Sequence, residues 1–379
     1  ATITNVGNTM IDSVQLGWII NGVAQPPVWY KTPLDTFGGS GLYEAEVTLG
    51  TYNFISGVSY AVQVFTYNPN NNADGDTQND TISITPTVGL GGTYTLGTGG
   101  SDYGSFAAAL TDLYAKGICD TVIFQVAAGT YFEELTLSEI AGTGPDAAVI
   151  FEGATGDSSD VTISWAGATS SANHVLYFNG ADWVRFRNMT IENTHNSYDR
   201  VVRIGDHSNH IAFNNCEIAN NAASTPYNND LITIDYNINS NDLELTNNRF
   251  YHGYRAFQNA GNNAHHFTIR GNHFVDQQYG ALYIYNADYL SIEDNVISSA
   301  PGSGFYAIDI QYCDIGLSVQ RNIIRNISAD FGIRLYQCSF TSADHGIIAN
   351  NFIHFNNSSA SAEGIIVQYS DYVDVVYNT

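Results

Sequence analysis

Few side chains of this sequence are suited to acid–base chemistry on a polysaccharide. Elimination at a uronic acid needs a base for the proton and a cation that neutralises the sugar carboxylate. The chain holds only two lysines, Lys31 and Lys116, so arginine would have to supply that cation. Arg185 and Arg187 stand two positions apart in one alternating run, without an acidic cluster beside them. We therefore predict that the arginines are structural and that no residue is catalytic.

Flat side chains recur at one position of a repeated pattern, directly before its first apolar residue. Six of the eight copies carry an aromatic ring or an imidazole there, and these six are our candidate glycan-stacking residues: Trp183, His210, His266, Tyr289, His345 and Tyr372. The rings could form a strip that stacks on sugars, or a corner column in which they stack on one another. We favour the corner column. The three histidines are not in neighbouring copies, so we expect no metal site there.

One short acidic segment, "DGDTQND", offers oxygen ligands. Its four candidate ligands are Asp74, Asp76, Asn79 and Asp80, and Ca²⁺ prefers such oxygens. The spacing differs from that of an EF-hand loop, and we favour a plain acidic turn. Ca²⁺ is the one cofactor that we weigh, and we expect no other.

The charge balance narrows the range of partners. The 379 residues include 12 basic and 37 acidic ones, a net charge of −25, so nucleic acid and anionic membranes are poor partners. No run of 18 apolar residues occurs, and we expect no membrane insertion. Four cysteines are too few for a disulfide scaffold. Cys313 and Cys338 share one slot of the repeat, where they either bridge or stack as small apolar side chains.

The elements that position these residues follow from an internal repeat of 23 to 32 residues. Six of the eight copies read apolar, any, apolar, any, any, Asn, any, apolar, as in "LSIEDNVIS" and "LSVQRNIIR", and Met189 and Cys216 fill the Asn slot in the two before. The second apolar position is held by Phe186, Phe213, Leu245, Ile269, Ile292, Val319, Ile348 and Val375. Alternation of period two predicts a short strand in each copy, with a second strand before it. We predict a β-solenoid of about ten coils.

Six successive copies keep an asparagine in the same slot: Asn248, Asn272, Asn295, Asn322, Asn351 and Asn378. Coils about 4.8 Å apart would align these amides in a structural ladder, each donating to one neighbour and accepting from the other. Opposite charges one coil apart favour the same register. The predicted pairs are Glu217 with Arg249, Arg270 with Glu293, Asp294 with Arg321, and Asp309 with Arg334.

Two segments ahead of the repeat differ from it. "SFAAALTDLYAKG", about 105–117, has an apolar helical face and Ser105 to cap its start, and we expect this helix to cap the solenoid. Residues 1–88 alternate in short runs between turn residues, the pattern of a β-sandwich. A linker, 89–100, then leads to a solenoid over 101–379. We expect a portion of a longer exported protein, truncated at the C-terminal end of the solenoid.

Two resemblances agree with this division. "GTYTLGTGGSDYGSFAAAL" and the repeats of 101–379 are similar to the right-handed parallel β-helix repeat proteins that Bacteroidota export. "ITNVGNT" and "YNPNNNADGDTQND" resemble the immunoglobulin-like, cell-adhesion-related (CARDB-like) domain of bacterial surface proteins. The resemblance implies an all-β chain: an immunoglobulin-like β-sandwich, then a right-handed parallel β-helix with a short N-terminal capping α-helix. It implies a large extracellular or cell-surface protein delivered by type IX secretion. It also implies O-glycosylation, with Ser13, Thr81 and Thr121 as candidates.

The same fold carries enzymes as well as inert stalks. Its hydrolases resemble one another in "NTD", "DD" and "GHG" motifs on neighbouring coils, which supply paired carboxylates. Here "NTH", 193–195, and "DHG", 344–346, are faint echoes in distant coils, and no "DD" occurs. We expect a non-catalytic structural or adhesive module of an adhesin or extracellular filament, with surface glycans or other copies or domains of the same protein as partners. The alternative is a polysaccharide lyase or glycan-binding enzyme of the pectate-lyase-like class.

Overall fold

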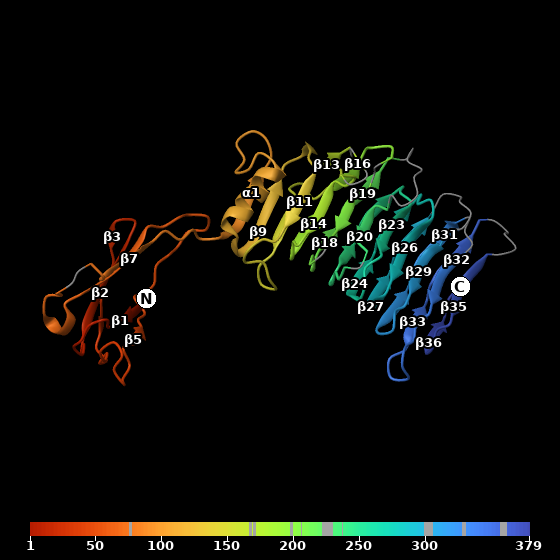
Figure 1. The fold of residues 1–379 in the computed structure, drawn as a ribbon. Helices are drawn as coiled ribbons and strands as arrows, with labels where there is room; N and C mark the ends of the chain where they lie inside the picture. Colours follow the sequence, from red (N-terminus) through yellow and green to blue (C-terminus); the bar gives the residue numbers. More distant parts are fainter. Residues whose placement is uncertain are drawn as a thin grey trace. The chain divides into compact units, whose positions relative to one another are not determined.

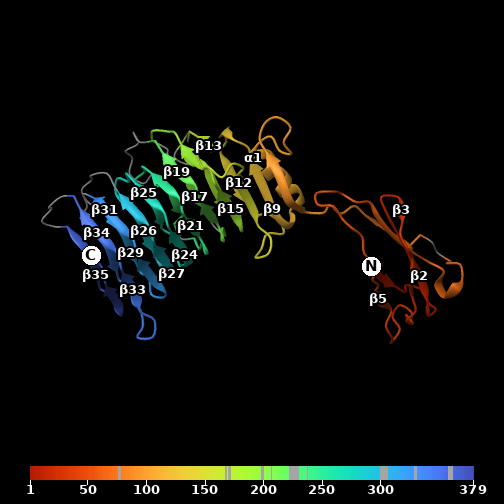
Figure 2. The ribbon, with the colours of Figure 1, turned by 180° about the vertical axis from the view of Figure 1, so that it is seen from behind.

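The chain divides into two compact units, Ala1–Leu90 and Gly91–Thr379. The computed structural model describes residues 1–75, 78–166, 169, 172–197, 200–205, 207–221, 230–236, 238–298, 306–327, 331–356 and 362–379. The second unit is a β-solenoid, in which strands of successive coils lie side by side (Figures 1 and 2). The predicted solenoid is thus confirmed.

Three sheets run along the second unit. The first sheet has nine strands: β10(Gly129–Phe132), β13(Val161–Trp165), β16(Thr190–Asn193), β19(Glu217–Asn220), β22(Arg249–Tyr251), β25(His273–Val275), β28(Val296–Ser298), β31(Ile323–Ile327) and β34(Phe352–Phe355). The second sheet has nine: β11(Leu135–Ser138), β14(Leu176–Asn179), β17(Val202–Ile204), β20(Ile232–Ile234), β23(Arg255–Asn259), β26(Gly280–Tyr285), β29(Tyr306–Gln311), β32(Phe331–Tyr336) and β35(Glu363–Gln368). The third has eleven: β8(Leu90–Leu96), β9(Ile118–Val126), β12(Val149–Gly153), β15(Val184–Arg187), β18(Ala212–Asn214), β21(Glu244–Thr246), β24(Ala264–Arg270), β27(Ala287–Glu293), β30(Leu317–Gln320), β33(Gly346–Ala349) and β36(Val373–Val376). Nine coils, rather than about ten, therefore carry all three strands.

The repeat aligns in space as its sequence predicts. Each residue at the second apolar position pairs with its counterpart one coil away, from Phe186 with Phe213 to Ile348 with Val375. The pattern alternates buried and half-exposed residues because one side of each strand faces the interior. Phenylalanine rings stack along this column at the N-terminal end, with Phe124 and Phe151 centroids 4.9 Å apart.

The asparagine ladder is present and fully hydrogen-bonded. Between neighbouring rungs, each Nδ2 donates to the Oδ1 of the next asparagine over 2.9 to 3.1 Å. The same Nδ2 also donates to a main-chain oxygen of the preceding coil, as Asn295 does to Ile269. The residue just before each rung has a positive φ that bends the corner, as in Asn247 and Gly271. Five of these amides are buried and Asn378 is half-exposed, so the ladder satisfies polar groups that would otherwise destabilise the interior.

Two predicted charge pairs form as expected. Arg334 contacts Asp309 over 2.7 Å, and Arg321 contacts Asp294 over 2.7 Å. Glu293 lies opposite Arg270 in the register, but Arg270 contacts Asp294 instead.

A helix and an additional strand cover the N-terminal end of the solenoid. Helix α1(Phe106–Lys116) begins after Ser105, whose Oγ accepts a hydrogen bond from the main-chain nitrogen of Ala108. Phe106 is fully buried and lies against Phe151, with ring centroids 5.3 Å apart. Strand β8 occupies much of the predicted linker, and the linker assignment of 89–100 is corrected accordingly. Its alternating "GGTYTL" lets it pair with β9 as the edge of the third sheet.

The first unit consists of small antiparallel sheets. One pairs β1(Thr2–Thr4) with β5(Glu44–Glu46). The other contains β2(Val14–Ile20), β3(Val23–Ala24), β4(Val28–Tyr30), β6(Val62–Tyr67) and β7(Thr81–Ile84), and a 3-10 turn, η1(Pro69–Asn71), lies between β6 and β7. Ile3 of one sheet and Leu16 of the other belong to the same buried cluster. The antiparallel strands agree with the predicted alternation.

Candidate functional site

The six predicted stacking residues lie at one corner of the solenoid, along the third sheet. Four of them precede strands of that sheet, whereas His266 lies within β24 and Tyr289 within β27. Most residues in this slot have a positive φ, including Trp183 and Tyr289. Their rings contact one another in pairs: the centroids of Trp183 and His210 are 3.7 Å apart, and those of His266 and Tyr289 are 4.8 Å apart. The geometry agrees with the corner column that we favoured, and a role in sugar stacking stays a prediction.

Carboxylates link the imidazoles of this corner. Asp242 belongs to the coil between those of His210 and His266. Its carboxylate oxygens lie 3.3 Å from Nδ1 of His210 and 3.5 Å from Nδ1 of His266. Further along, Asp374 lies 3.1 Å from Nδ1 of His345. Among the residues that the structure describes, no three His, Cys, Asp or Glu side chains are arranged to hold a metal ion.

The weak Ca²⁺ candidate is only partly visible, because Asp76 lies outside the described residues. Of the others, Asp80 accepts a hydrogen bond from the Thr66 hydroxyl over 3.2 Å, and Asn79 is exposed. Asp74 is half-buried. The plain acidic turn that we favour, and Ca²⁺ binding as its alternative, both stay predictions.

The three candidate glycosylation residues differ in solvent exposure. Thr81 is exposed on the edge strand β7, and Ser13 is half-buried. The hydroxyl of Thr121 accepts a hydrogen bond from the main-chain nitrogen of Ala148 over 3.3 Å. Thr81 is therefore the most accessible of the three.

The two hydrolase-like motifs are not brought together. Asn193 is buried at the end of β16, where its Nδ2 donates to the main-chain oxygen of Arg200. Asp344 precedes β33, and its carboxylate accepts from the main-chain nitrogen of Gly316. Both side chains thus form hydrogen bonds with main-chain atoms.

Tyrosines, arginines and aspartates gather along the second sheet, and of these the sequence singled out only Asp309 and Arg334. Here arginines lie on tyrosine rings, and each contacts an aspartate on a neighbouring coil. We call this the arginine–tyrosine face; its members are Tyr177, Arg203, Asp230, Asp235, Tyr254, Arg255, Tyr279, Tyr283, Tyr306, Asp309, Arg334 and Tyr336.

At the N-terminal part of this face, the guanidinium of Arg203 lies 4.4 Å from the Tyr177 ring centroid. Its Nε and Nη2 contact the Asp235 carboxylate over 2.7 to 3.0 Å. Hydrogen bonding to Asp235 raises the pKa of Arg203 despite partial burial. The pair is therefore a fixed, neutral unit.

At the centre, Arg255 lies among three tyrosine rings. Its guanidinium carbon is 4.9 to 5.0 Å from the centroids of Tyr254, Tyr279 and Tyr283. The carboxylate of the fully buried Asp230 is 3.7 Å from Nη1 of Arg255. A hollow of about 10 Å³ beside it, with room for about one water molecule, is lined in part by Tyr279 and Tyr283.

Towards the C-terminal end, Arg334 repeats this arrangement. Its guanidinium lies 4.6 Å from the Tyr306 ring centroid and makes two hydrogen bonds of 2.7 and 2.9 Å to Asp309. Burial alone would lower the pKa of Arg334, but the bonds to Asp309 raise it. Since the aspartates neutralise these arginines, the face suits uncharged, hydroxyl-rich ligands, which tyrosine rings and planar polar groups can contact.

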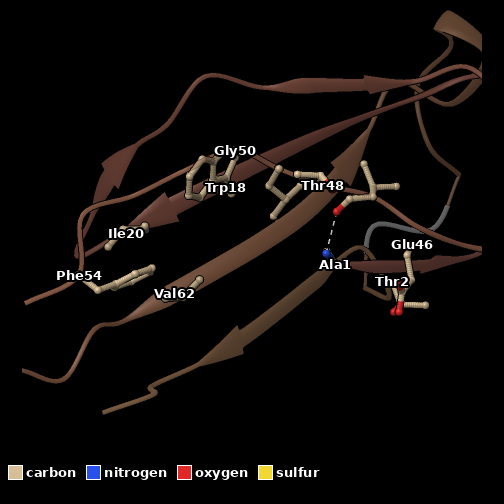
Figure 3. A pocket seen from close by; sticks show the side chains of 11 residues that line it. Ala1, Thr2, Trp18, Ile20, Glu46, Thr48, Gly50, Phe54 and Val62 are labelled. Atoms are coloured by element: carbon tan, nitrogen blue, oxygen red, sulfur yellow. Dashed lines mark hydrogen bonds between the residues drawn. The ribbon is translucent and has the colours of Figure 1, made fainter. Parts of the chain in front are cut away.

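The first unit contains a separate cavity of about 460 Å³, shown in Figure 3. Trp18, Ile20, Phe54 and Val62 give it an apolar wall. The amino group of Ala1 donates a hydrogen bond of 2.8 Å to the main-chain oxygen of Val47 beside it. No predicted site residue lines this cavity.

Comparisons with known proteins define the class of fold. Residues 228–379 match the family model described as "Right handed beta helix region", so the chain contains a right-handed β-helix region. No curated protein sequence matches the chain. In the part that the structure describes, no helix is long and apolar enough to span a membrane.

The chain is distantly similar to several solved structures, all at low identity and low TM-score. The first is a pectin methylesterase with a bound hexasaccharide, at 9% identity and a TM-score of 0.36, covering 76% of this chain and 92% of that one. The pectin methylesterase of Aspergillus niger is 12% identical, with a TM-score of 0.33, and the alignment covers 76% and 89% of the two chains. An exopolygalacturonase of Yersinia enterocolitica is 10% identical, with a TM-score of 0.27, covering 100% and 98%.

Proposed function

We propose that this chain is a non-catalytic adhesive module of a large secreted or cell-surface protein, and that its arginine–tyrosine face binds neutral glycans. The single observation behind the proposal is the repeated Arg–Asp–Tyr arrangement on the second sheet, exemplified by Arg334, Asp309 and Tyr306. Rings stacked on paired guanidinium groups form a flat, polar surface that needs little ordering when a sugar binds.

The scaffold supports this role. The buried asparagine ladder and the stacked interior hold the second sheet in a fixed register along the solenoid. The net charge of −25 keeps such modules soluble and apart from anionic surfaces. Sites on rigid strands position their contact groups better than sites on loops.

The proposal includes the first unit. We assign residues 1–88 to the immunoglobulin-like, CARDB-like adhesion domains, because its two antiparallel sheets share the cluster that contains Ile3 and Leu16. Export through type IX secretion and a Bacteroidota source belong to the same proposal. They rest on the resemblance of the sequence.

A binding experiment tests the adhesive role. The whole chain would be titrated with neutral oligosaccharides such as cello-, manno- and xylo-oligosaccharides. Tyr279→Ala should weaken binding about tenfold, which corresponds to about 1.4 kcal/mol, because it removes a ring that borders the hollow. Tyr236→Ala is the matched control, since Tyr236 is 74% exposed and lies outside the face.

The same preparation decides between this proposal and the lyase alternative. Alginate, pectin and glycosaminoglycans would be incubated with the chain while the ultraviolet absorbance of unsaturated products is followed. Sustained product formation would establish a polysaccharide lyase in place of a non-catalytic module. Failure of every neutral glycan to bind would remove the ligand assignment of the arginine–tyrosine face.

A further inference from the structure

A second surface, on the third sheet, differs from the arginine–tyrosine face in its charge. Strand β15 places Val184 and Phe186 in the interior and directs Arg185 and Arg187 outward. Within the described residues, neither arginine takes part in a hydrogen bond or an ion pair. Two strand positions correspond to about 7 Å, so the two guanidinium groups can act on one extended ligand.

Within the described residues no group beside these arginines forms an ion pair with them, although Glu152 keeps its negative charge. Glu152 lies opposite Arg187 on β12, but its carboxylate accepts from Nε2 of Gln125 over 2.9 Å and from Nδ2 of Asn188 over 3.3 Å. On the other side β18 presents the small Ala212 opposite Arg185. By contrast, Arg203 and Arg334 are held by carboxylates at 2.7 Å.

An aromatic ring stands directly before this strand. Trp183 stacks on His210 with an interplanar angle of 15°. The register of β12 and β15 pairs Val149 with Val184, so Ala148 holds the position equivalent to Trp183 in the preceding coil. An alanine has no ring to cover the indole, and Trp183 is the first ring of its column.

We propose that Trp183, Arg185 and Arg187 form a binding site for acidic saccharides carrying carboxylate or sulfate groups. The forked guanidinium donors match both anions, and the apolar face of a sugar ring packs on indole. Nucleic acid is a poorer ligand, because two arginines neutralise few phosphates and the chain carries a net charge of −25. The site lies on another sheet from the arginine–tyrosine face and takes the opposite class of glycan, so it stands independently of that proposal.

Calorimetric titration of the whole chain tests the site. The probes are an oligogalacturonate, a sulfated chondroitin oligosaccharide, a neutral cello-oligosaccharide and a single-stranded oligonucleotide of similar length. We expect the acidic saccharides to bind, with an affinity that falls as salt rises. R185Q/R187Q should weaken that binding about tenfold or more, because charge-assisted hydrogen bonds are lost.

Two further variants separate this site from general charge attraction. R249Q/R325Q removes the same charge from two exposed arginines of the first sheet and should leave binding within about twofold of the native chain. W183N removes the indole and keeps a residue that tolerates the positive φ, and it should also weaken binding. Circular dichroism melts confirm that each variant is folded.

Every outcome bears on the proposal. Selective loss in R185Q/R187Q and W183N supports it. It is overturned if no acidic saccharide binds the native chain, if R185Q/R187Q binds normally, or if both double variants weaken binding equally. Tighter binding of the oligonucleotide than of either acidic saccharide also overturns it.

Discussion

Nδ2 of Asn295 donates to Oδ1 of Asn322, one coil further along, over 2.9 Å. The main-chain nitrogen of Asn295 donates to the same oxygen over 3.1 Å, and the Asn295 Nδ2 also reaches the main-chain oxygen of Ile269. Its own Oδ1 accepts two hydrogen bonds from Asn272. One amide therefore connects three coils, which makes it a sensitive point for testing the ladder.

Asn295→Ala should lower the free energy of unfolding by about 2–4 kcal/mol, because buried donors on Asn272 and the oxygen of Ile269 lose their partners. Urea denaturation followed by circular dichroism measures the change. Asn378→Ala is the control, since Asn378 is the half-exposed last rung, and its effect should be smaller. Equal midpoints for the native chain and Asn295→Ala would show that the ladder contributes nothing.

Phe186→Ala tests the ring column of the interior. Phe186 is fully buried and stacks between Phe151 and Phe213, with centroids 5.2 and 5.7 Å away. The cavity left behind should destabilise the solenoid by about 3–5 kcal/mol. Thermal melts measure this, and Phe132→Ala, at a residue 74% exposed, should change stability little. A similar loss in both variants would contradict the column's role.

His174 gives the solenoid a dependence on pH. Its side chain is 6% exposed, and burial, assisted by Arg203 and Arg200, lowers the pKa of His174 from 6.5 to about 4. The unfolded chain therefore binds a proton at a higher pH than the folded chain does. The stability that this histidine contributes is present above pH 6.5 and is lost as the pH falls to about 4.

Chemical denaturation at several pH values measures that contribution. Between pH 6.5 and about 4, the native chain should lose roughly 1–3 kcal/mol more than His174→Gln does. His354→Gln, at an exposed residue, should retain the slope of the native chain. Parallel curves for the native chain and His174→Gln would refute the prediction.

The four thiols should differ in reactivity. Cys119 is exposed, whereas Cys216, Cys313 and Cys338 are buried, and burial raises the pKa of Cys338 to about 11. A thiol reagent should therefore modify one cysteine in the folded chain and four after denaturation. Modification of only two in the denatured chain would instead identify a bridge between Cys313 and Cys338. In the part of the chain that the structure describes, none of the four cysteines forms a disulfide.

The solenoid was predictable because its stabilising contacts repeat along the sequence. Asn248 and Asn272 occupy the same slot one coil apart, and the opposite charges of Asp309 and Arg334 also face each other at the coil spacing. Such repeated positions indicate how successive coils align. Strand β8 escaped prediction because its glycines read as a linker, although Leu90 and Leu96 are buried on it. A single edge strand has no repeated partner in the sequence to indicate it.

Apart from the pair of Asp309 and Arg334, the arginine–tyrosine face could not be predicted in the same way. Tyr254 and Tyr279 belong to turns, while Arg255 begins a strand and Asp230 precedes another. Their convergence depends on how the connections between the first and second sheets differ in length. No fixed interval links these residues, so only the folded chain brings the guanidinium, the rings and the carboxylate together.

The column of amides has a direction. From Asn248 to Asn351, each Nδ2 donates to the Oδ1 of the coil that follows, as in the step of 23 residues from Asn272 to Asn295. A segment of that length, repeated in tandem, would present a matching donor at one end and a matching acceptor at the other. An inserted coil with asparagine in this slot would therefore continue the ladder. An inserted coil with Asp or Leu in the slot would interrupt the ladder on both sides.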